Sequence, residues 1–254
     1  MTQAPAPPPV LELRGLSRRF GSLDVTRDVN FSLHEGARCA LIGPNGAGKT
    51  TLINLIGGRL QPSAGAILID GRDVTRLSEP ARVKAGVGRT FQITSLFRRL
   101  TLEENLALAV AEQRGVAGLL RPNRAVQAEI DARVAKILAA LRLADVARTR
   151  VDVLPYGVQR MVELGLALAL RPRLLLLDEP AAGVPRAEVG LIFEAIAQLP
   201  ASMAVLLVEH DIDVVFRFAT RIAVLVAGSI LVEGTPKEIS EHPEVRRLYL
   251  GTHA

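Results

Sequence analysis

Apolar residues fall into short runs that glycine and proline separate, and the period of each run distinguishes strands from helices. The predicted strands of the first third cover residues 10–16, 30–33, 38–42 and 66–69. One helix is predicted there, over residues 49–56, directly after the third strand and a glycine-rich bend. The chain therefore starts with a β-rich part that contains one strand–bend–helix unit.

The pattern becomes helical between residues 102 and 146. Apolar residues recur there at helical spacing and form one face: Ile130, Val134, Ile137, Leu138 and Leu141. We therefore expect an inserted helical subdomain in the middle of the chain.

Strands and helices alternate again in the last third. The predicted elements are a helix over residues 159–170, a strand over 174–177, a helix over 186–199, a strand over 204–208, and a hairpin of 222–226 and 230–232. Such alternation is typical of a parallel sheet with helices on both faces. The fold is therefore expected to be α/β.

Composition excludes several classes of protein. The 254 residues are 49% hydrophobic and 22% charged, as in a well-packed globular chain. The net charge of +5 favours anionic partners, but the basic residues are scattered and aromatic residues make up only 4%, which argues against nucleic acid as a partner. The single cysteine, Cys39, lies in an apolar run and is expected to be a buried thiol.

A phosphate-binding loop is predicted at residues 43–50, which read Gly-Pro-Asn-Gly-Ala-Gly-Lys-Thr between a strand and a helix. Glycines let backbone N–H groups approach a polyphosphate, and the helix N-terminus points its positive end at the same anion. Lys49 supplies an ammonium group for the β- and γ-phosphates, and the Thr50 hydroxyl is placed to ligate Mg²⁺. The predicted contacts to ATP are Gly43, Pro44, Asn45, Gly46, Ala47, Gly48, Lys49, Thr50 and Thr51.

Acidic residues end the apolar strand at 174–177, where Asp178 and Glu179 follow it. Such a strand delivers negative charge to the ligand-bearing edge of the sheet, so Asp178 is expected to hold Mg²⁺. Glu179 is the candidate to orient and polarise the water that attacks the γ-phosphorus.

Three further residues are weaker candidates from sequence. His210 follows the strand at 204–208 and would reach the same edge, although a capping histidine explains it equally well. Gln92 lies where the nucleotide-binding core gives way to the helical insert, and it could touch Mg²⁺ and sense the insert. Phe20 could stack on adenine or belong to the core.

In this order, the motifs resemble the ATP-binding subunits of ABC transporters over nearly the whole chain. The resemblance makes Phe20 the adenine-stacking aromatic, Gln92 the Q-loop glutamine, residues 154–160 the signature motif, Asp178-Glu179 the magnesium and catalytic carboxylates, and His210 the switch histidine. Four stretches are most similar to the branched-chain amino-acid uptake group, and to its larger ATPase subunit: Arg-Thr-Phe-Gln, Leu-Phe-Arg-Arg-Leu-Thr, Asp-Glu-Pro-Ala-Ala-Gly and Tyr-Leu-Gly.

The resemblance implies a P-loop NTPase core, which is a mostly parallel sheet flanked by helices, with an N-terminal antiparallel β part and the helical insert. A disordered proline-rich tail is expected over residues 1–9, followed by one ABC ATPase domain over 10–254. Within that domain, residues 10–91 and 161–254 would form the nucleotide-binding core. Residues 92–160 would form the helical subdomain with the Q-loop and the signature.

The resemblance also implies partners. Two ATP-binding subunits, identical or different, would dimerise head to tail, with each ATP between the phosphate loop of one chain and the signature of the other. Gly157 and Gln159 are the signature residues expected to contact that ATP. Closure would be passed through Gln92 to membrane permease subunits, and indirectly to a periplasmic or extracellular solute-binding protein. The chain would then lie peripherally on the cytoplasmic face of the inner membrane.

Two stretches depart from the family pattern. Pro155 stands where the signature usually has the serine that meets the γ-phosphate, and proline offers neither a hydroxyl nor an N–H group. Gly157 and the start of the next helix would then bind phosphate through the backbone. Gly183-Val184-Pro185 replaces the usual Leu-Asp of the D-loop, the segment expected to connect the two ATP sites.

Alternative functions follow from the same motifs. The ATPase of lipopolysaccharide export shares the short length and similar surroundings of the Q-loop. A P-loop phosphotransferase would use the same cradle, but the sequence offers no acceptor pocket or lid. The two departures are also consistent with a degenerate regulatory subunit beside a more active paralogue.

Overall fold

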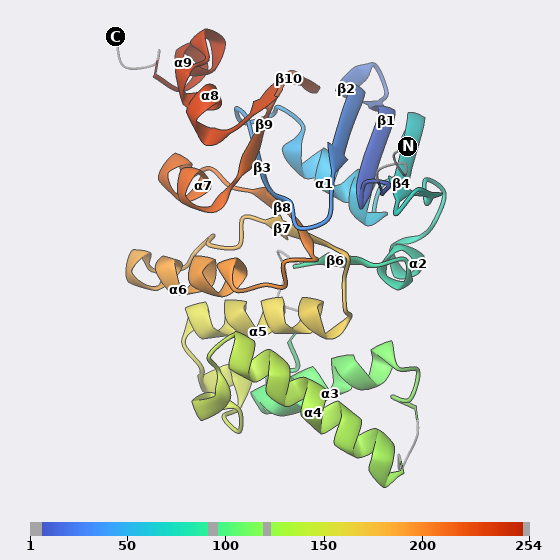
Figure 1. Ribbon diagram of the computed structural model, residues 1–254, viewed down its shortest axis with the longest axis vertical. Helices are drawn as coiled ribbons and strands as arrows, with labels where there is room; N and C mark the ends of the chain where they lie inside the picture. The colour runs from blue at the N-terminus through green and yellow to red at the C-terminus, as the bar shows by residue number, and fades with distance from the viewer. Residues whose placement is uncertain (1–6, 91–95, 119–122, 251–254) are drawn as a thin grey trace, which may run out of the picture. The chain divides into compact units, whose positions relative to one another are not determined.

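The computed structural model describes residues 7–90, 96–118 and 123–250, which form two compact units (Figure 1). The first unit comprises Met1–Val87, Arg173–Asp178 and Ala201–Ala254, and the second comprises Gly88–Pro172 and Glu179–Pro200. The expected proline-rich tail lies mostly outside the described residues, since the description starts at Pro7.

A four-stranded antiparallel sheet opens the first unit. Its strands, in spatial order, are β2 (Leu23–Leu33), β1 (Leu11–Phe20), β4 (Ala64–Ile69) and β5 (Arg72–Asp73). β1 and β2 form a hairpin that pairs Leu11 with Leu33 and Phe20 with Leu23. Both strands extend beyond the predicted 10–16 and 30–33. The prediction was too short because the outer half of the hairpin is more exposed and carries polar residues without a clear alternation.

The second sheet carries the candidate site, and its strands belong to this unit except residues 88–89 at one edge. Its six strands lie in the order β10 (Ser229–Gly234), β9 (Arg221–Val226), β3 (Arg38–Ile42), β8 (Ala204–Val208), β7 (Leu174–Asp178) and β6 (Val87–Arg89). β3 pairs in parallel with β8 and β9, and β7 in parallel with β8. β9 and β10 form the antiparallel hairpin that the sequence predicts. The prediction of a mostly parallel sheet is therefore confirmed.

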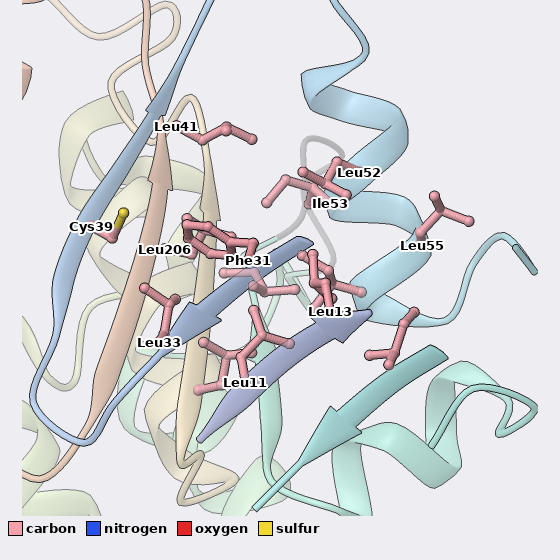
Figure 2. Packing of buried hydrophobic residues seen from close by; sticks show 14 of the residues in the cluster. Leu11, Leu13, Phe31, Leu33, Cys39, Leu41, Leu52, Ile53, Leu55 and Leu206 are labelled. Carbon is pink, nitrogen blue, oxygen red and sulfur yellow. The ribbon is translucent and has the colours of Figure 1, made fainter. Parts of the chain in front are cut away.

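Strand β3 separates two hydrophobic cores. Cys39 and Leu41 point into the larger core with α1 (Lys49–Gly57) and the antiparallel sheet, as Figure 2 shows. Ala40 and Ile42 point into the smaller core with α7 (Ile212–Phe218), α8 (Pro236–Glu241) and α9 (Pro243–Leu250). Successive side chains of a strand face opposite sides, so this continuous apolar strand is buried on both.

Helices make up most of the second unit. They are α3 (Leu102–Gln113), α4 (Arg124–Ala140), α5 (Tyr156–Ala169) and α6 (Arg186–Ala197), with 3₁₀ turns at Ala144–Val146 and Val151–Val153. Thr101 and Glu104 form a capping box that starts α3. Gly165 of α5 lets α3 and α4 approach, since a Cβ atom there would lie 2.9 Å from Leu106 Cδ2 and 3.1 Å from Leu141 Cδ1.

Two boundaries have a clear local cause. Helix α5 begins at Tyr156, three residues before the predicted start, because Pro155 takes the N-cap position and proline is tolerated at a helix start. The short helix α2 (Glu79–Lys84) begins with a proline in its first turn. Among the described residues, every helix is too short or too polar to cross a bilayer.

Candidate functional site

Three parallel strands end at one edge of the six-stranded sheet. Asp178 at the end of β7 pairs in register with Val208 at the end of β8, and Val208 pairs with Leu41 near the end of β3. The predicted phosphate loop follows β3, and His210 comes two residues after β8. The structure therefore brings the loop, Asp178 and the His210 segment together at the carboxyl edge, which is where open α/β sheets bind ligands.

The phosphate loop joins β3 to α1 and needs glycine at specific points. Gly48 is the N-cap of α1 with φ of 103°, and a Cβ atom there would lie 2.6 Å from the Val25 carbonyl oxygen. A Cβ atom at Gly43 would overlap the Leu225 carbonyl oxygen. Side chains are excluded at both positions, so the loop backbone packs directly on β2 and β9.

The hairpin turn between β9 and β10 supports the phosphate loop. The backbone N–H of Gly228 donates to the Ala47 carbonyl oxygen at 3.0 Å, and the Gly228 carbonyl oxygen accepts from Arg27 N–H at 2.7 Å. The middle of the loop is therefore tied to β2 and to a turn that is far away in the sequence.

The ammonium group of Lys49 lies within the loop. Its Nζ donates to the carbonyl oxygens of Gly43 at 2.6 Å and Pro44 at 3.0 Å, and the residue is buried. Asn45 and Thr50 are exposed, while Pro44 and Thr51 are half-buried. The loop thus combines a buried cation, a helix N-terminus and an accessible hydroxyl, as polyphosphate binding requires.

The C-terminal helix α9 reaches this region through Tyr249. Burial raises the pKa of the Tyr249 hydroxyl to about 12, and a contact with the Gly43 backbone lowers it by a smaller amount. The ring packs on the smaller core that contains Ala40 and Ile42 of β3. The end of the described chain therefore packs against the strand and the first glycine of the phosphate loop.

The candidate catalytic residues differ in their surroundings. Asp178 is 4% exposed, and Glu179 is half-buried with φ of 50°, which is unusual for a residue with a side chain. His210 is exposed, and its backbone N–H donates to the Glu209 carboxylate at 3.2 Å. Asp178 and His210 belong to the first unit and Glu179 to the second.

The signature stretch begins helix α5 in the second unit. Gly157 is buried, and a Cβ atom there would overlap the carboxylate of Glu188 on α6. The Gln159 side chain donates its Nε2 hydrogen to the Leu154 carbonyl oxygen at 2.8 Å, which closes the start of the helix. The Gln159 amide therefore supports the backbone around Gly157.

Of the two remaining predicted residues, Phe20 is exposed and Gln92 is not among the described residues. Phe20 ends β1 with 42% of its surface exposed, and the Arg18 guanidinium lies 4.4 Å from its ring centroid. An exposed aromatic ring is consistent with adenine stacking, which stays a prediction. Gln92 lies outside the described residues.

Sequence reasoning named residues 154–160 only as the signature motif and missed the contacts that Tyr156 and Arg160 make with residues 182–183. The Arg160 guanidinium stacks on the Tyr156 ring 5.0 Å from its centroid and donates to the Ala182 carbonyl oxygen. The available signal was their spacing, since residues four apart on a helix are neighbours. That spacing identifies the pair but not its contact with residues 182–183.

A mostly parallel sheet with a glycine-rich loop, a buried lysine at a helix start and a buried aspartate at the end of a nearby strand defines a nucleotide-binding protein of the P-loop NTPase class. The family model for ABC transporters matches residues 26–182. A second model, for the branched-chain amino acid ATP-binding cassette transporter, matches residues 229–254.

Similar proteins cover nearly the whole chain. BraF of Pseudomonas aeruginosa, a high-affinity branched-chain amino acid transport ATP-binding protein, is 38% identical over 250 residues, which are 96% of this chain and 98% of BraF. LivG of Escherichia coli, which carries the same description, is 39% identical with the same coverage. The lipopolysaccharide export ATP-binding protein LptB of Acidithiobacillus ferridurans is 34% identical over 95% of this chain and 97% of LptB.

Solved structures agree with this assignment. A nucleotide-free ATP-binding cassette of an ABC transporter has a TM-score of 0.81 at 27% identity and covers 95% of this chain and 98% of that one. A cassette in its ADP conformation also has a TM-score of 0.81 at 27% identity, with coverage of 96% and 99%. The chain belongs to the ABC transporter family and is an ATP-hydrolysing cassette.

Proposed function

We propose that this chain is the ATPase subunit of an importer for branched-chain amino acids or related amides. The observation that carries this proposal is the match of residues 229–254 to the model named for branched-chain amino acid cassettes. That segment includes α9, which packs through Tyr249 against the strand that leads into the phosphate loop. BraF and LivG, named for the same transport, support it along the rest of the chain.

The phosphate loop binds the triphosphate of ATP in this proposal. Backbone N–H groups of the loop face the phosphate oxygens, and Lys49 turns its ammonium group from loop carbonyls to the β- and γ-phosphates. Phe20 stacks on the adenine with its exposed ring.

Magnesium fits the donors that this unit offers. The Thr50 hydroxyl and the Asp178 carboxylate are hard oxygen ligands, and the described residues contain no cluster of three or more His, Cys, Asp or Glu that could hold an ion alone. That donor set suits an ion shared with nucleotide phosphates. When bound, Mg²⁺ would neutralise charge on the β- and γ-phosphates. Gln92 is a further proposed ligand.

Hydrolysis is assigned to Glu179 and His210. The Glu179 carboxylate orients a water and accepts its proton as the water oxygen bonds to the γ-phosphorus and the bond to the β–γ bridging oxygen breaks. His210 is exposed after β8, where its imidazole can contact the released γ-phosphate. The position of Glu179 directly after Asp178 supports this division of roles.

Assembly involves a second ATP-binding subunit and membrane permease subunits. Gly157 and Gln159 place the start of α5 over the γ-phosphate that the partner's loop holds. Phe97 is 61% exposed, lies beside Arg98 and Arg99, and has its backbone fixed by the Asn105 side chain at 2.9 and 3.1 Å. A rigidly held exposed aromatic beside two cations is suited to a permease segment on the cytoplasmic face of the membrane.

Two substitutions test the proposal. Lys49→Ala should lower ATP affinity by about 10-fold or more, because it removes the charge from the cradle. Glu179→Gln should keep ATP affinity within about 2-fold and lower turnover by about 100-fold or more. Titration with labelled ATP and release of free phosphate measure the two effects, with Lys84→Ala as an exposed lysine control.

Copurification identifies the transport system. Permeases for branched-chain amino acids in the detergent-solubilised complex are the expected partners, and Phe97→Ser should weaken their retention. Recovery of lipopolysaccharide export components instead would contradict the proposal, and a phosphorylated acceptor in place of free phosphate would indicate a phosphotransferase.

A further inference from the structure

Helix α5 contacts the turn that carries Glu179, and Arg160 donates a hydrogen bond to that turn. Arg160 lies in the second turn of α5, and its Nη2 donates to the Ala182 carbonyl oxygen at 3.5 Å. We infer that Arg160 is a positioning residue for ATP hydrolysis, which holds the turn of residues 179–183 in its active geometry. This inference rests on the proposed role of Glu179 as the base.

A buried ion pair fixes the direction of the arginine. Arg160 Nη1 donates to Glu163 Oε2 at 2.8 Å, and the two side chains are only 13% and 7% exposed. If the guanidinium left this position, the buried Glu163 carboxylate would have no ion-pair partner, which costs several kcal/mol. The Arg160 side chain is therefore held in one conformation, unlike a surface arginine that samples many rotamers.

Tyr156 makes the second contact with the same turn. Its ring lies under the Arg160 guanidinium, with 5.0 Å between the guanidinium carbon and the ring centroid. The edge of the ring faces Gly183, where a Cβ atom would lie 3.4 Å from Tyr156 Cε1. Helix α5 therefore supports two successive residues of the turn, Ala182 through the guanidinium and Gly183 through the ring.

The supported turn contains a strained catalytic residue. The Ala182 N–H donates to the Glu179 carbonyl oxygen at 3.0 Å, and Glu179 has φ of 50°. A non-glycine residue in this left-handed region costs about 1–3 kcal/mol and persists only where surrounding contacts hold it. Arg160 holds the carbonyl of the residue whose N–H closes the turn, so its loss lets Glu179 relax and displaces the carboxylate.

Removal of the whole ion pair tests the inference. In Arg160→Met/Glu163→Met, no buried charge is left unpaired, so the fold should survive. We expect kcat for ATP hydrolysis to fall by about 10- to 100-fold, because a displacement of about 1 Å in a catalytic group has effects of this size. ATP affinity, measured on the undimerised chain, should stay within about 2-fold, since the phosphate loop belongs to the other unit and the signature residues are proposed to contact only the ATP that a partner holds.

Matched variants separate positioning from general stability. Arg114→Met/Glu129→Met removes another ion pair of the same unit, away from the turn, and should leave kcat unchanged. Arg160→Lys keeps the charge and should restore part of kcat. Tyr156→Leu leaves the Arg160–Glu163 pair intact and should lower kcat with little change in ATP affinity. If the double variant does not unfold cooperatively in urea, and is therefore not folded, Tyr156→Leu tests the inference in its place.

The outcomes distinguish this inference from the proposed function. Unchanged kcat in the folded double variant or in Tyr156→Leu, together with lost turnover in Glu179→Gln, would overturn the role of Arg160 alone. Normal turnover in Glu179→Gln would show that Glu179 is not the base, and it would overturn the positioning role of Arg160 as well. A parallel fall of kcat and ATP affinity in the double variant would indicate global damage and would also overturn the inference.

Discussion

Replacement of Arg82 by methionine is expected to destabilise the protein, because this arginine closes the back end of the phosphate-loop helix. Arg82 lies on α2 with 0% of its surface exposed. Its guanidinium donates to the carbonyl oxygens of Leu55 and Ile56 at the last turn of α1, and to that of Thr75. Arg82→Met removes all of these donors at once.

The size of the effect follows from two opposed contributions. The Leu55 carbonyl oxygen keeps the Gly58 N–H at 3.3 Å, so the main cost comes from the carbonyl oxygens of Ile56 and Thr75. Each buried carbonyl oxygen left without a donor costs about 1–3 kcal/mol. Loss of the buried charge returns part of this cost, since burial lowers the pKa of Arg82 to about 10, with a smaller opposite effect of Asp73. We therefore expect the free energy of unfolding to fall by about 2–5 kcal/mol, within the range for a broken buried network.

Urea unfolding followed by circular dichroism measures this free energy. Lys84→Met is the matched control, because Lys84 is exposed on the same helix and its loss should change stability by less than about 0.5 kcal/mol. Arg82→Lys should lie between the two. A loss below about 1 kcal/mol in Arg82→Met would refute the reasoning that the arginine satisfies the end of α1.

Three further outcomes are expected. Burial raises the pKa of Cys39 to about 12, so a thiol reagent at pH 8 should label the native protein at least about 100-fold more slowly than the urea-unfolded chain, and fast native labelling would contradict the packing of β3. Gly165→Val should lower the free energy of unfolding by about 1–3 kcal/mol, because the new side chain would overlap Leu106. Gly190→Ala in α6 has open space around it and should raise the free energy of unfolding by about 0.5–1 kcal/mol. Equal effects of the two substitutions would refute the close helix contact at Gly165. ATP with magnesium at 100 times its Kd should stabilise the protein by about 2.7 kcal/mol. At the same ligand concentration, Lys49→Ala should lose about half of this increment or more, because its affinity is expected to be at least about 10-fold lower; full stabilisation of that variant would contradict ATP binding by the phosphate loop.

The parts of the fold that depend on short-range patterns could be predicted from the sequence. The strand, bend and helix around Lys49 follow from glycine spacing and from apolar runs only a few residues long. β8 has the predicted bounds of 204–208 because its ends coincide with the ends of one apolar run. The buried state of Cys39 follows from its place in such a run.

Features that depend on distant contacts could not be predicted. The hydrogen bond from Gly228 to Ala47 joins residues whose proximity only the assembled sheet determines. The turn of residues 179–183 gives no sequence signal for its contact with Arg160 and Tyr156. The outer half of the β1–β2 hairpin was missed because its exposed residues do not alternate in polarity, and only pairing between the strands defines it.

The support of the phosphate loop by the β9–β10 turn has a consequence for synthesis on the ribosome. The loop emerges early, but Gly228 and Leu225, which pack against it, are made about 180 residues later. A nascent chain therefore acquires the supported phosphate loop only after the β9–β10 hairpin has been made. Ribosome-bound fragments that stop before the hairpin are therefore expected to bind ATP more weakly than chains that include it.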